Sequence, residues 1–297
     1  MSFNTPILYL VFNRPDLVKI TFEKIKEIKP KQLFIAADGP REDRPDDIQK
    51  CKQTREYILS KIDWNCDVKT LFREKNLGCK YAVSSAITWF FENVEMGIIL
   101  EDDCLPSQSF FWFCQKLLEK YKDDQRIMQI NGSCFLDKVD ITESYFFSKY
   151  NHIWGWASWR RAWNLYELEN LDFEHDFEKI CFHNSKEKKY WHKTFIRYFE
   201  GKVNTWDYPW TFSVWKNNGL AVYPSKNMIK NIGFREDSTH IKNADPQFVK
   251  MNLNEINCNN IIHPAISLNR KLDLLEFEKR FAPKKFISRI ISKIFNS

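Results

Sequence analysis

Four short apolar runs in the first third of the chain are each followed by polar residues. The lengths of the runs are typical of strands, and they cover residues 7–12, 32–37, 67–72 and 97–100. The segments between them are typical of helices and cover residues 15–28, 45–61 and 79–93. Strands that alternate with helices in this way predict repeated βαβ units and an α/β fold with a mostly parallel sheet.

The polar residues stand at equivalent points, directly after the strands. They are Asn13 and Arg14 after the first strand, Asp38 after the second, Arg73, Asn76 and Gly78 after the third, and Glu101, Asp102 and Asp103 after the fourth. The carboxyl ends of parallel strands lie along one rim of the sheet, where such folds bind their ligands. We therefore expect these side chains to converge on one site.

Three adjacent acids end the fourth strand, and Pro106 then ends the extended segment. Neighbouring carboxylates repel one another, so a positive group must hold them or solvent must separate them. Carboxylate oxygens are the hard ligands that Mg²⁺ or Mn²⁺ prefers. The pattern favours a divalent metal site, and a solvated acidic turn is the alternative.

The second half of the chain has a less regular pattern. It predicts a helix at 108–120, a strand at 127–130, charged helices within 173–201, a strand at 220–224 and a loop at 232–240. Four tryptophans lie within residues 154–163. There is no internal repeat and no low-complexity linker, so we expect both halves to share one compact body.

The formal net charge of +6 is concentrated at the C-terminus. From Lys279 onward there are six basic residues and no acid, and the remaining 39 basic residues balance 39 acidic ones. A neutral body argues against a nucleic acid as partner, because nucleic-acid-binding domains carry a basic face.

The same tail alternates apolar and basic residues at helical spacing. Its apolar positions are Phe286, Ile287, Ile290, Ile291, Ile294 and Phe295. An apolar face opposite a basic one is typical of a helix that lies on an anionic membrane surface. A terminal helix that docks on the body through its apolar face is the alternative.

Cysteine usage and hydropathy favour a reducing compartment. The eight cysteines form no C-x-x-C pair, which indicates neither a zinc site nor a disulfide framework. The first residues lack the features of a signal peptide, and no apolar run is long enough to span a bilayer. We expect a cytoplasmic protein.

The sequence lacks the motifs of several other enzyme classes. There is no legible Ser-His-Asp triad, no Walker-type loop and no G-x-G-x-x-G after the first strand. These absences argue against a dinucleotide enzyme or a P-loop enzyme. A phosphate-bearing ligand would have to be held by side chains and a metal.

The motifs at the strand ends resemble those of GT-A-fold glycosyltransferases. They are the segment 12–15 (Phe-Asn-Arg-Pro), the Asp-Gly pair at 38–39, Arg73 with the Asn-Leu-Gly segment 76–78, and the Glu-Asp-Asp segment 101–103. The sequence is similar to bacterial family-2-like sugar transferases over about residues 6–240. It is more distantly similar to the N-acetylglucosaminyltransferase I type, whose metal motif is also Glu-Asp-Asp.

The resemblance implies a GT-A fold, which is Rossmann-like with a mostly parallel sheet and flanking helices, followed here by a C-terminal amphipathic helix. Residues 1–270 would form the glycosyltransferase domain, with the nucleotide-sugar site in 1–106 and the acceptor site in 107–270. Residues 271–297 would form the basic tail.

The resemblance also implies roles for the strand-end residues. Asp38 would bind the donor's nucleobase, with UDP favoured, and Arg14 and Arg73 would lie near the base and the diphosphate. Glu101 and Asp102 would contact the ribose and the donor sugar. Asp103 would hold Mn²⁺ or Mg²⁺, and His240 is a candidate second ligand, although a lone surface histidine is the alternative.

An inverting sugar transfer also needs a base to deprotonate the acceptor hydroxyl. Asp207 is the best candidate, because aromatic neighbours such as Trp206 and Tyr208 would raise its pKa toward the working range. A helix N-cap is the alternative role for Asp207, and Asp237 is a weaker candidate base.

Aromatic faces suit sugar rings, so Trp154, Trp156 and Trp206 are candidates for the acceptor site, with a structural core as the alternative. The sequence thus predicts a metal-dependent glycosyltransferase. It would act on a glycan or lipid-linked acceptor in bacterial surface polysaccharide synthesis, at the inner face of the cytoplasmic membrane. A sugar nucleotidyltransferase and a non-catalytic carbohydrate- or nucleotide-binding protein are the alternatives.

Overall fold

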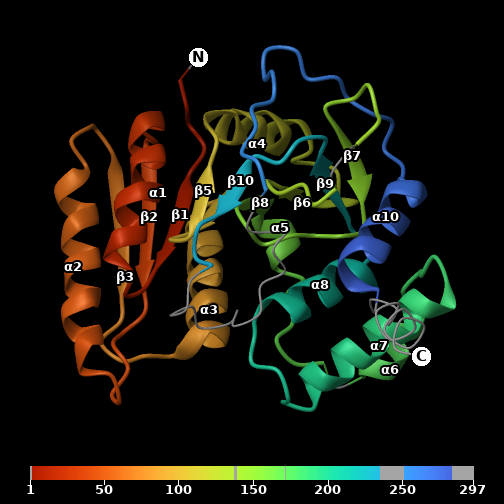
Figure 1. Cartoon of the computed structure of the whole chain (residues 1–297), viewed down its shortest axis with the longest axis horizontal. Coiled ribbons are helices and arrows are strands. Elements are labelled where there is room, and N and C mark those ends of the chain that lie inside the picture. The colour runs from red at the N-terminus through yellow and green to blue at the C-terminus, as the bar shows by residue number, and fades with distance from the viewer. Residues whose placement is uncertain (1, 137–138, 171, 235–250, 283–297) are drawn as a thin grey trace, which may run out of the picture.

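The computed structural model describes residues 2–136, 139–170, 172–234 and 251–282 of the 297-residue chain. Within these residues, an eight-stranded sheet crosses the molecule in the order β3-β2-β1-β4-β8-β6-β9-β7 (Figure 1). A smaller two-stranded sheet pairs β10 with β5.

The first half of the chain confirms the predicted alternation. Its strands are β1 (Ile7–Val11), β2 (Gln32–Ala37), β3 (Asp67–Phe72) and β4 (Met96–Glu101). The helices between them are α1 (Pro15–Ile28), α2 (Pro45–Lys61) and α3 (Gly78–Asn93). The four strands are parallel, so their carboxyl ends meet at one edge.

The second half extends the same sheet with strands of mixed direction. They are β6 (Ile127–Asn131), β7 (Tyr145–Ser148), β8 (Trp156–Trp159) and β9 (Leu220–Pro224). Strand β8 is antiparallel to both β4 and β6, and β9 is parallel to β6. β6 and β9 therefore run in the direction of β4, and the predicted α/β fold with a mostly parallel sheet is confirmed.

Two short strands and several helices complete the described fold. The strands are β5 (Cys104–Pro106) and β10 (Ile229–Asn231). The helices are α4 (Gln108–Lys120), α5 (Arg160–Trp163), α6 (Phe173–Glu178), α7 (Ser185–Phe199), α8 (Asp207–Lys216), α10 (Arg270–Glu276) and the π-helix η1 (Phe277–Phe281). None of the helices in the described ranges is long and apolar enough to cross a membrane.

Helices cover both faces of the sheet, which explains the continuous apolar run of β1. Ile7 and Tyr9 pack in one core with α1, α2 and α4, whereas Leu8 and Leu10 pack in a second core with α3 and the helices of the second half. Successive side chains of a strand point to opposite faces. A strand covered on both faces must therefore be apolar at every position.

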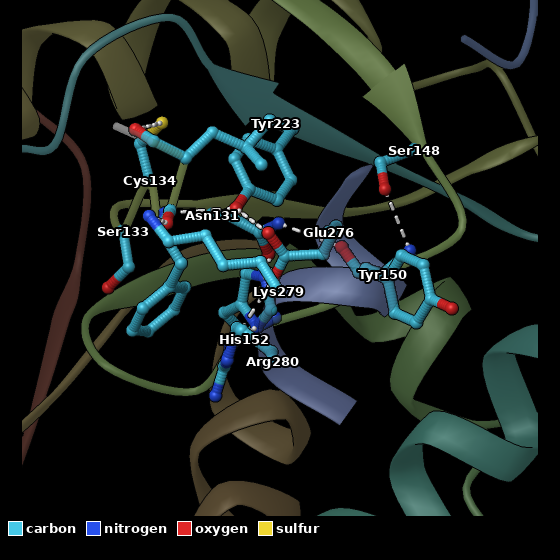
Figure 2. A network of polar contacts seen from close by, with 12 residues as sticks. Asn131, Ser133, Cys134, Ser148, Tyr150, His152, Tyr223, Glu276, Lys279 and Arg280 are labelled. Carbon is cyan, nitrogen blue, oxygen red and sulfur yellow. Dashed lines mark hydrogen bonds and ion pairs between the residues drawn. The ribbon is translucent and has the colours of Figure 1, made fainter. Parts of the chain in front are cut away.

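The first residues after position 270, which the sequence analysis assigns to the tail, pack against the body. Asp273 and Glu276 of α10 are buried, and Phe277 is buried in the second core. Figure 2 shows Glu276 directed toward His152 and Tyr223, whose hydroxyl donates to Glu276 at 2.8 Å. These polar contacts fix α10 against the sheet. The apolar positions from Phe286 onward lie outside the described residues.

Candidate functional site

A cavity of about 360 Å³ opens at the carboxyl edge of β1, β2 and β4. It is lined by six of the residues that the sequence singles out: Arg14, Asp38, Arg73, Glu101, Asp102 and Asp103. The strand order explains their convergence, because β3, β2, β1 and β4 are neighbours that end side by side. The predicted site is thus one continuous pocket of a size that small ligands occupy.

Arg14 is the positive group that holds the acids after β4. Its Nη1 donates to Asp103 Oδ2 at 3.0 Å, and its Nη2 donates to Asp102 Oδ1. The backbone N–H of Phe12 donates to the other oxygen of Asp102 at 3.2 Å. Asp102 is only 1% exposed, and a carboxylate so deeply buried needs such charged partners to remain ionised.

The acids outnumber the cation at this corner. Burial raises the pKa of Glu101 to about 8, and the neighbouring Asp103 adds to that shift. Burial also raises the pKa of Asp102, to about 6, although Arg14 opposes the rise. Burial lowers the pKa of Arg14, but Asp102 and Asp103 outweigh that effect and the net shift is upward. A cation bound at this corner would favour the ionised forms of these acids.

Asp103 offers an accessible carboxylate to a cation that also binds phosphate. Its carboxylate is 16% exposed and lines the pocket. No group of three or more His, Cys, Asp or Glu side chains is arranged to hold a metal ion anywhere in the described part of the chain. Mg²⁺ at phosphate sites takes one or two carboxylates and completes its shell with water and phosphate, so one accessible carboxylate is sufficient. His240 and Asp237 lie outside the described residues.

Asp38 lines the pocket, and its carboxylate already binds four protein donors. Oδ1 accepts from the backbone N–H groups of Gly39 and Leu77, at 2.9 and 3.0 Å. Oδ2 accepts from the side chain of Asn76 at 3.0 Å and from the backbone N–H of Gly78 at 3.1 Å. Asp38 thus binds the amides at the start of α3 and ties the loop after β2 to the loop after β3.

Arg73 lies at the far side of the same edge. Its Nη2 donates to Ser85 Oγ on α3 at 2.8 Å. Burial lowers the pKa of its guanidinium, and Asp38 only partly offsets that effect. Arg73 therefore brings a second cation to the pocket, on the side of β3.

Sequence reasoning missed several lining residues, among them Arg41, Asn231 and Gly233. Asn231 ends β10 and Gly233 follows it, and the pairing of β10 with β5 returns the chain to the acids. Asn231 accepts a hydrogen bond from the backbone N–H of Gly233 at 2.8 Å, and the N–H of Ile232 donates to the carbonyl of Asp103 at 2.8 Å. No local sequence signal predicts this long-range pairing.

Asp207 stands beside the pocket. It is the first residue of α8, whereas Trp206 is the N-cap residue. Its carboxylate accepts a hydrogen bond from the hydroxyl of Thr205. Its charge adds, after burial and other acids, to the upward shift in the pKa of Glu101. Asn204, three residues earlier, lines the pocket itself.

Two of the three predicted acceptor tryptophans are core residues. Trp156 is fully buried in β8, Trp206 is 1% exposed, and their rings stack with centroids 5.9 Å apart. Neither ring offers a face to a ligand, so the structural alternative holds for both. Trp154 is partly buried and packs against Phe135 and Phe234, with ring centroids 5.1 and 5.4 Å away.

Comparisons with known proteins assign the chain to no family. No family model matches it, and no curated protein sequence matches it. Among solved structures, a mannosyltransferase from Pyrobaculum calidifontis in complex with GDP-Man and Mn²⁺ is similar over 52% of this chain and 44% of its own, at 16% identity and a TM-score of 0.33. An apo UDP-glucose pyrophosphorylase is similar over 77% of this chain and 93% of its own, at 9% identity and a TM-score of 0.40. This chain thus spans less than half of the mannosyltransferase, and similarities of this size establish no function.

Proposed function

We propose that the chain is a metal-dependent glycosyltransferase that moves a sugar from a nucleotide sugar to a glycan or lipid-linked acceptor, with inversion. The observation that carries the proposal is the pocket corner at which Arg14 bridges Asp102 and Asp103. A diphosphate needs cations, and a metal on Asp103 needs an accessible carboxylate. Both requirements are met at one edge of the sheet, beside the further cation of Arg73.

Each donor-site residue predicted from the sequence has a role in this proposal. Arg14 and Arg73 lie near the base and the diphosphate, Glu101 and Asp102 contact the ribose and the donor sugar, and Asp38 lies at the nucleobase end. Asp103 would hold Mn²⁺ or Mg²⁺, with His240 as a second ligand. When bound, the metal would supply positive charge to the departing nucleoside diphosphate.

Asp207 is the proposed base. Its carboxylate would take the proton from the acceptor hydroxyl as that oxygen attacks the anomeric carbon, on the face opposite the leaving group. Two observations support this role: Asp207 begins α8, and its charge acts on Glu101, which lines the donor pocket. Trp154 is the predicted acceptor tryptophan that remains partly accessible.

The proposal also covers where in the cell the enzyme acts. A membrane-bound acceptor in surface polysaccharide synthesis would suit the basic, apolar C-terminal tail, which would hold the enzyme at the inner face of the cytoplasmic membrane. Vesicles with and without anionic lipid, tested with the full chain and with a chain ending at residue 282, check this part by itself.

The test of the main proposal is the melting temperature with UDP, GDP, dTDP and CDP, each with and without Mn²⁺. A ligand that binds the native state at a hundredfold excess over its dissociation constant stabilises it by about 2.7 kcal/mol. We expect a metal-dependent rise with one nucleotide that is lost in Asp103→Ala. The absence of any rise would refute the donor site and favour a carbohydrate-binding protein without donor chemistry.

A product assay separates the two transferase classes. A glycosyltransferase releases a nucleoside diphosphate from a nucleotide sugar. A sugar nucleotidyltransferase instead releases pyrophosphate when it is given a nucleoside triphosphate and a sugar phosphate. Release of pyrophosphate with no release of nucleoside diphosphate would overturn the proposed reaction while leaving the nucleotide site in place.

A further inference from the structure

Arg41 brings a third guanidinium into the pocket, at the end remote from Asp103. It follows β2 and lines the cavity together with Phe12, which follows β1. The guanidinium carbon lies 5.4 Å from the centroid of the Phe12 ring. A flat aromatic ring and a flat cation at one end of a pocket are suited to a planar ligand group.

Asp47, in the first turn of α2, fixes the orientation of this guanidinium. Its Oδ2 accepts from Arg41 Nε at 2.6 Å, and its Oδ1 accepts from Arg41 Nη2 at 3.1 Å. Oδ1 also accepts from the side chain of Asn13 at 2.6 Å. Burial alone would raise the pKa of Asp47, but the hydrogen bonds from Arg41 and Asn13 outweigh it and lower the pKa. The Asp47 side chain is only 3% exposed, so the pair is a rigid part of the wall.

This orientation leaves one edge of Arg41 available. The side edge, formed by Nε and Nη2, is bound to Asp47. The end edge carries one hydrogen of Nη1 and one hydrogen of Nη2, and in the described residues no protein acceptor is bound to Nη1. Such an edge is a two-pronged donor that matches two adjacent acceptor atoms.

Asp38 does not offer a matching acceptor. A carboxylate has about four lone-pair sites, and four protein donors already bind Asp38. The N3–H group of uracil or thymine, which needs an acceptor, would therefore have to compete with backbone amides that hold the start of α3. At this end of the pocket Arg41 therefore offers a free donor, whereas the Asp38 carboxylate is already occupied.

The strand order separates this end from the phosphate corner. β1 lies between β2 and β4, and strands are about 4.8 Å apart, so the ends of β2 and β4 are roughly 10 Å apart. A nucleoside diphosphate can bridge these two ends, with its phosphates near Arg14 and Asp103 and its base near Phe12 and Arg41. A phosphate role for Arg41 fits less well because it lies at the opposite end.

We infer that Arg41, oriented by Asp47, determines which nucleobase the donor carries. The two N–H groups of its end edge donate to two adjacent acceptors of the base, and the base stacks on Phe12. Guanine offers O6 and N7, and cytosine offers O2 and N3, whereas uracil, thymine and adenine offer no such pair. The inference rests on the proposed nucleotide-sugar site. The sequence resemblance implies a preference for uracil. The inference instead predicts a preference for guanine or cytosine.

Calorimetric titration of the full chain in the presence of Mn²⁺ tests this inference. The ligands are GDP, CDP, UDP, dTDP, ADP and inorganic pyrophosphate. We expect GDP or CDP to bind at least about tenfold more tightly than UDP, dTDP and ADP, and the comparison of GDP with CDP identifies the base. In Arg41→Met we expect that preference to disappear while pyrophosphate affinity stays within about twofold.

Two further variants test the role of Asp47 and the specificity of the effect. Asp47→Asn keeps the shape but loses the charge, so the base preference should fall, and Asp47→Asn should have no added effect in the Arg41→Met background. Arg44→Met is the matched control, because Arg44 lies in the same loop, is exposed and does not line the pocket. It should bind every ligand as the wild type does.

Several results would overturn the inference while the nucleotide site stands. They are a wild-type preference for UDP, dTDP or ADP, a preference that survives in Arg41→Met, and a loss of pyrophosphate affinity in Arg41→Met equal to the loss for the nucleotide. The last result would make Arg41 a phosphate ligand. If the wild type binds none of the nucleotides and no pyrophosphate, the proposed function fails and the inference fails with it.

Discussion

Gly233 lies against Asp103 so closely that a Cβ on the glycine would stand 2.6 Å from Asp103 Oδ2 and 3.1 Å from Arg14 Nη1. The two residues belong to segments far apart in the sequence, which β10 and β5 bring together. The backbone at Gly233 therefore forms the wall behind the Arg14–Asp103 ion pair. A side chain at this position must displace that pair.

Gly233→Ala should weaken nucleotide and metal binding by at least about tenfold, because the added methyl group would push Asp103 out of position. Titration with the preferred nucleotide and Mn²⁺ measures the effect. Arg44→Met is the control, because Arg44 is exposed and does not line the pocket, and it should bind as the wild type does. Unchanged binding in Gly233→Ala would show that Asp103 tolerates a side chain at this position.

Arg14→Met should destabilise the fold strongly. It leaves Asp102 buried without its cation, and loss of one partner of a buried ion pair costs about 3–5 kcal/mol. Denaturant unfolding measures the change in free energy. The double variant Arg14→Met/Asp102→Asn should recover part of the loss, because it no longer buries an unpaired charge. A single variant as stable as the wild type would show that Asp102 is neutral in the fold.

Asp38→Ala should cost about 1–3 kcal/mol of stability, because it leaves the backbone amides of Leu77 and Gly78 without an acceptor. Hydrogen exchange at these two amides should speed up more than exchange in the middle of α3. Asp38→Asn keeps one acceptor oxygen and should lose less. Unchanged exchange at both amides would argue that Asp38 does not bind the start of the helix.

Asp207→Asn should lower turnover by about 10²–10⁴-fold and leave donor binding nearly unchanged, as expected for loss of a general base. Rate and donor affinity are measured on the same preparation. Trp206→Phe is the structural control, because Trp206 is a core residue and should affect the melting temperature more than turnover. Full activity in Asp207→Asn would move the base to another carboxylate.

Stability should fall as the pH is lowered from about 6.5 to about 4, and His152 should account for a large part of this. Arg280 Nη1 donates to His152 Nδ1 at 2.8 Å, so the imidazole proton is on Nε2, which lies 3.1 Å from Glu276 (Figure 2). Burial and the charge of Arg280 lower the pKa of His152 to about 4, whereas the unfolded chain takes up a proton near 6.5.

That pKa difference corresponds to roughly 3 kcal/mol of stability that is present above pH 6.5 and is lost as the pH falls toward 4. Chemical denaturation at a series of pH values measures the slope. His152→Gln should flatten it in this window, although it also changes packing at neutral pH. His175→Gln, at an exposed histidine, should leave the slope unchanged. The same slope in His152→Gln would assign the acid sensitivity to other groups.

The sequence by itself determined the first half of the sheet and most of the pocket. Apolar runs as short as that of β1 can only be strands covered on both faces, and the polar residues after parallel strands must meet at one edge. Arg14, Asp38, Arg73 and the three acids were therefore predictable from local pattern alone. Each of these predictions depends on neighbours in sequence and on a topology that helix–strand alternation fixes.

Only the tertiary structure decided which partner each polar group takes. Arg14 bridges two acids, Asp38 is occupied by the start of α3, and Gly233 stands behind Asp103, because loops distant in sequence pack together. The burial of Trp156 and Trp206 was likewise undecided, since an aromatic residue suits a core and a ligand face equally well in sequence. A residue's type limits the contacts it can make, but the packing of distant segments selects among them.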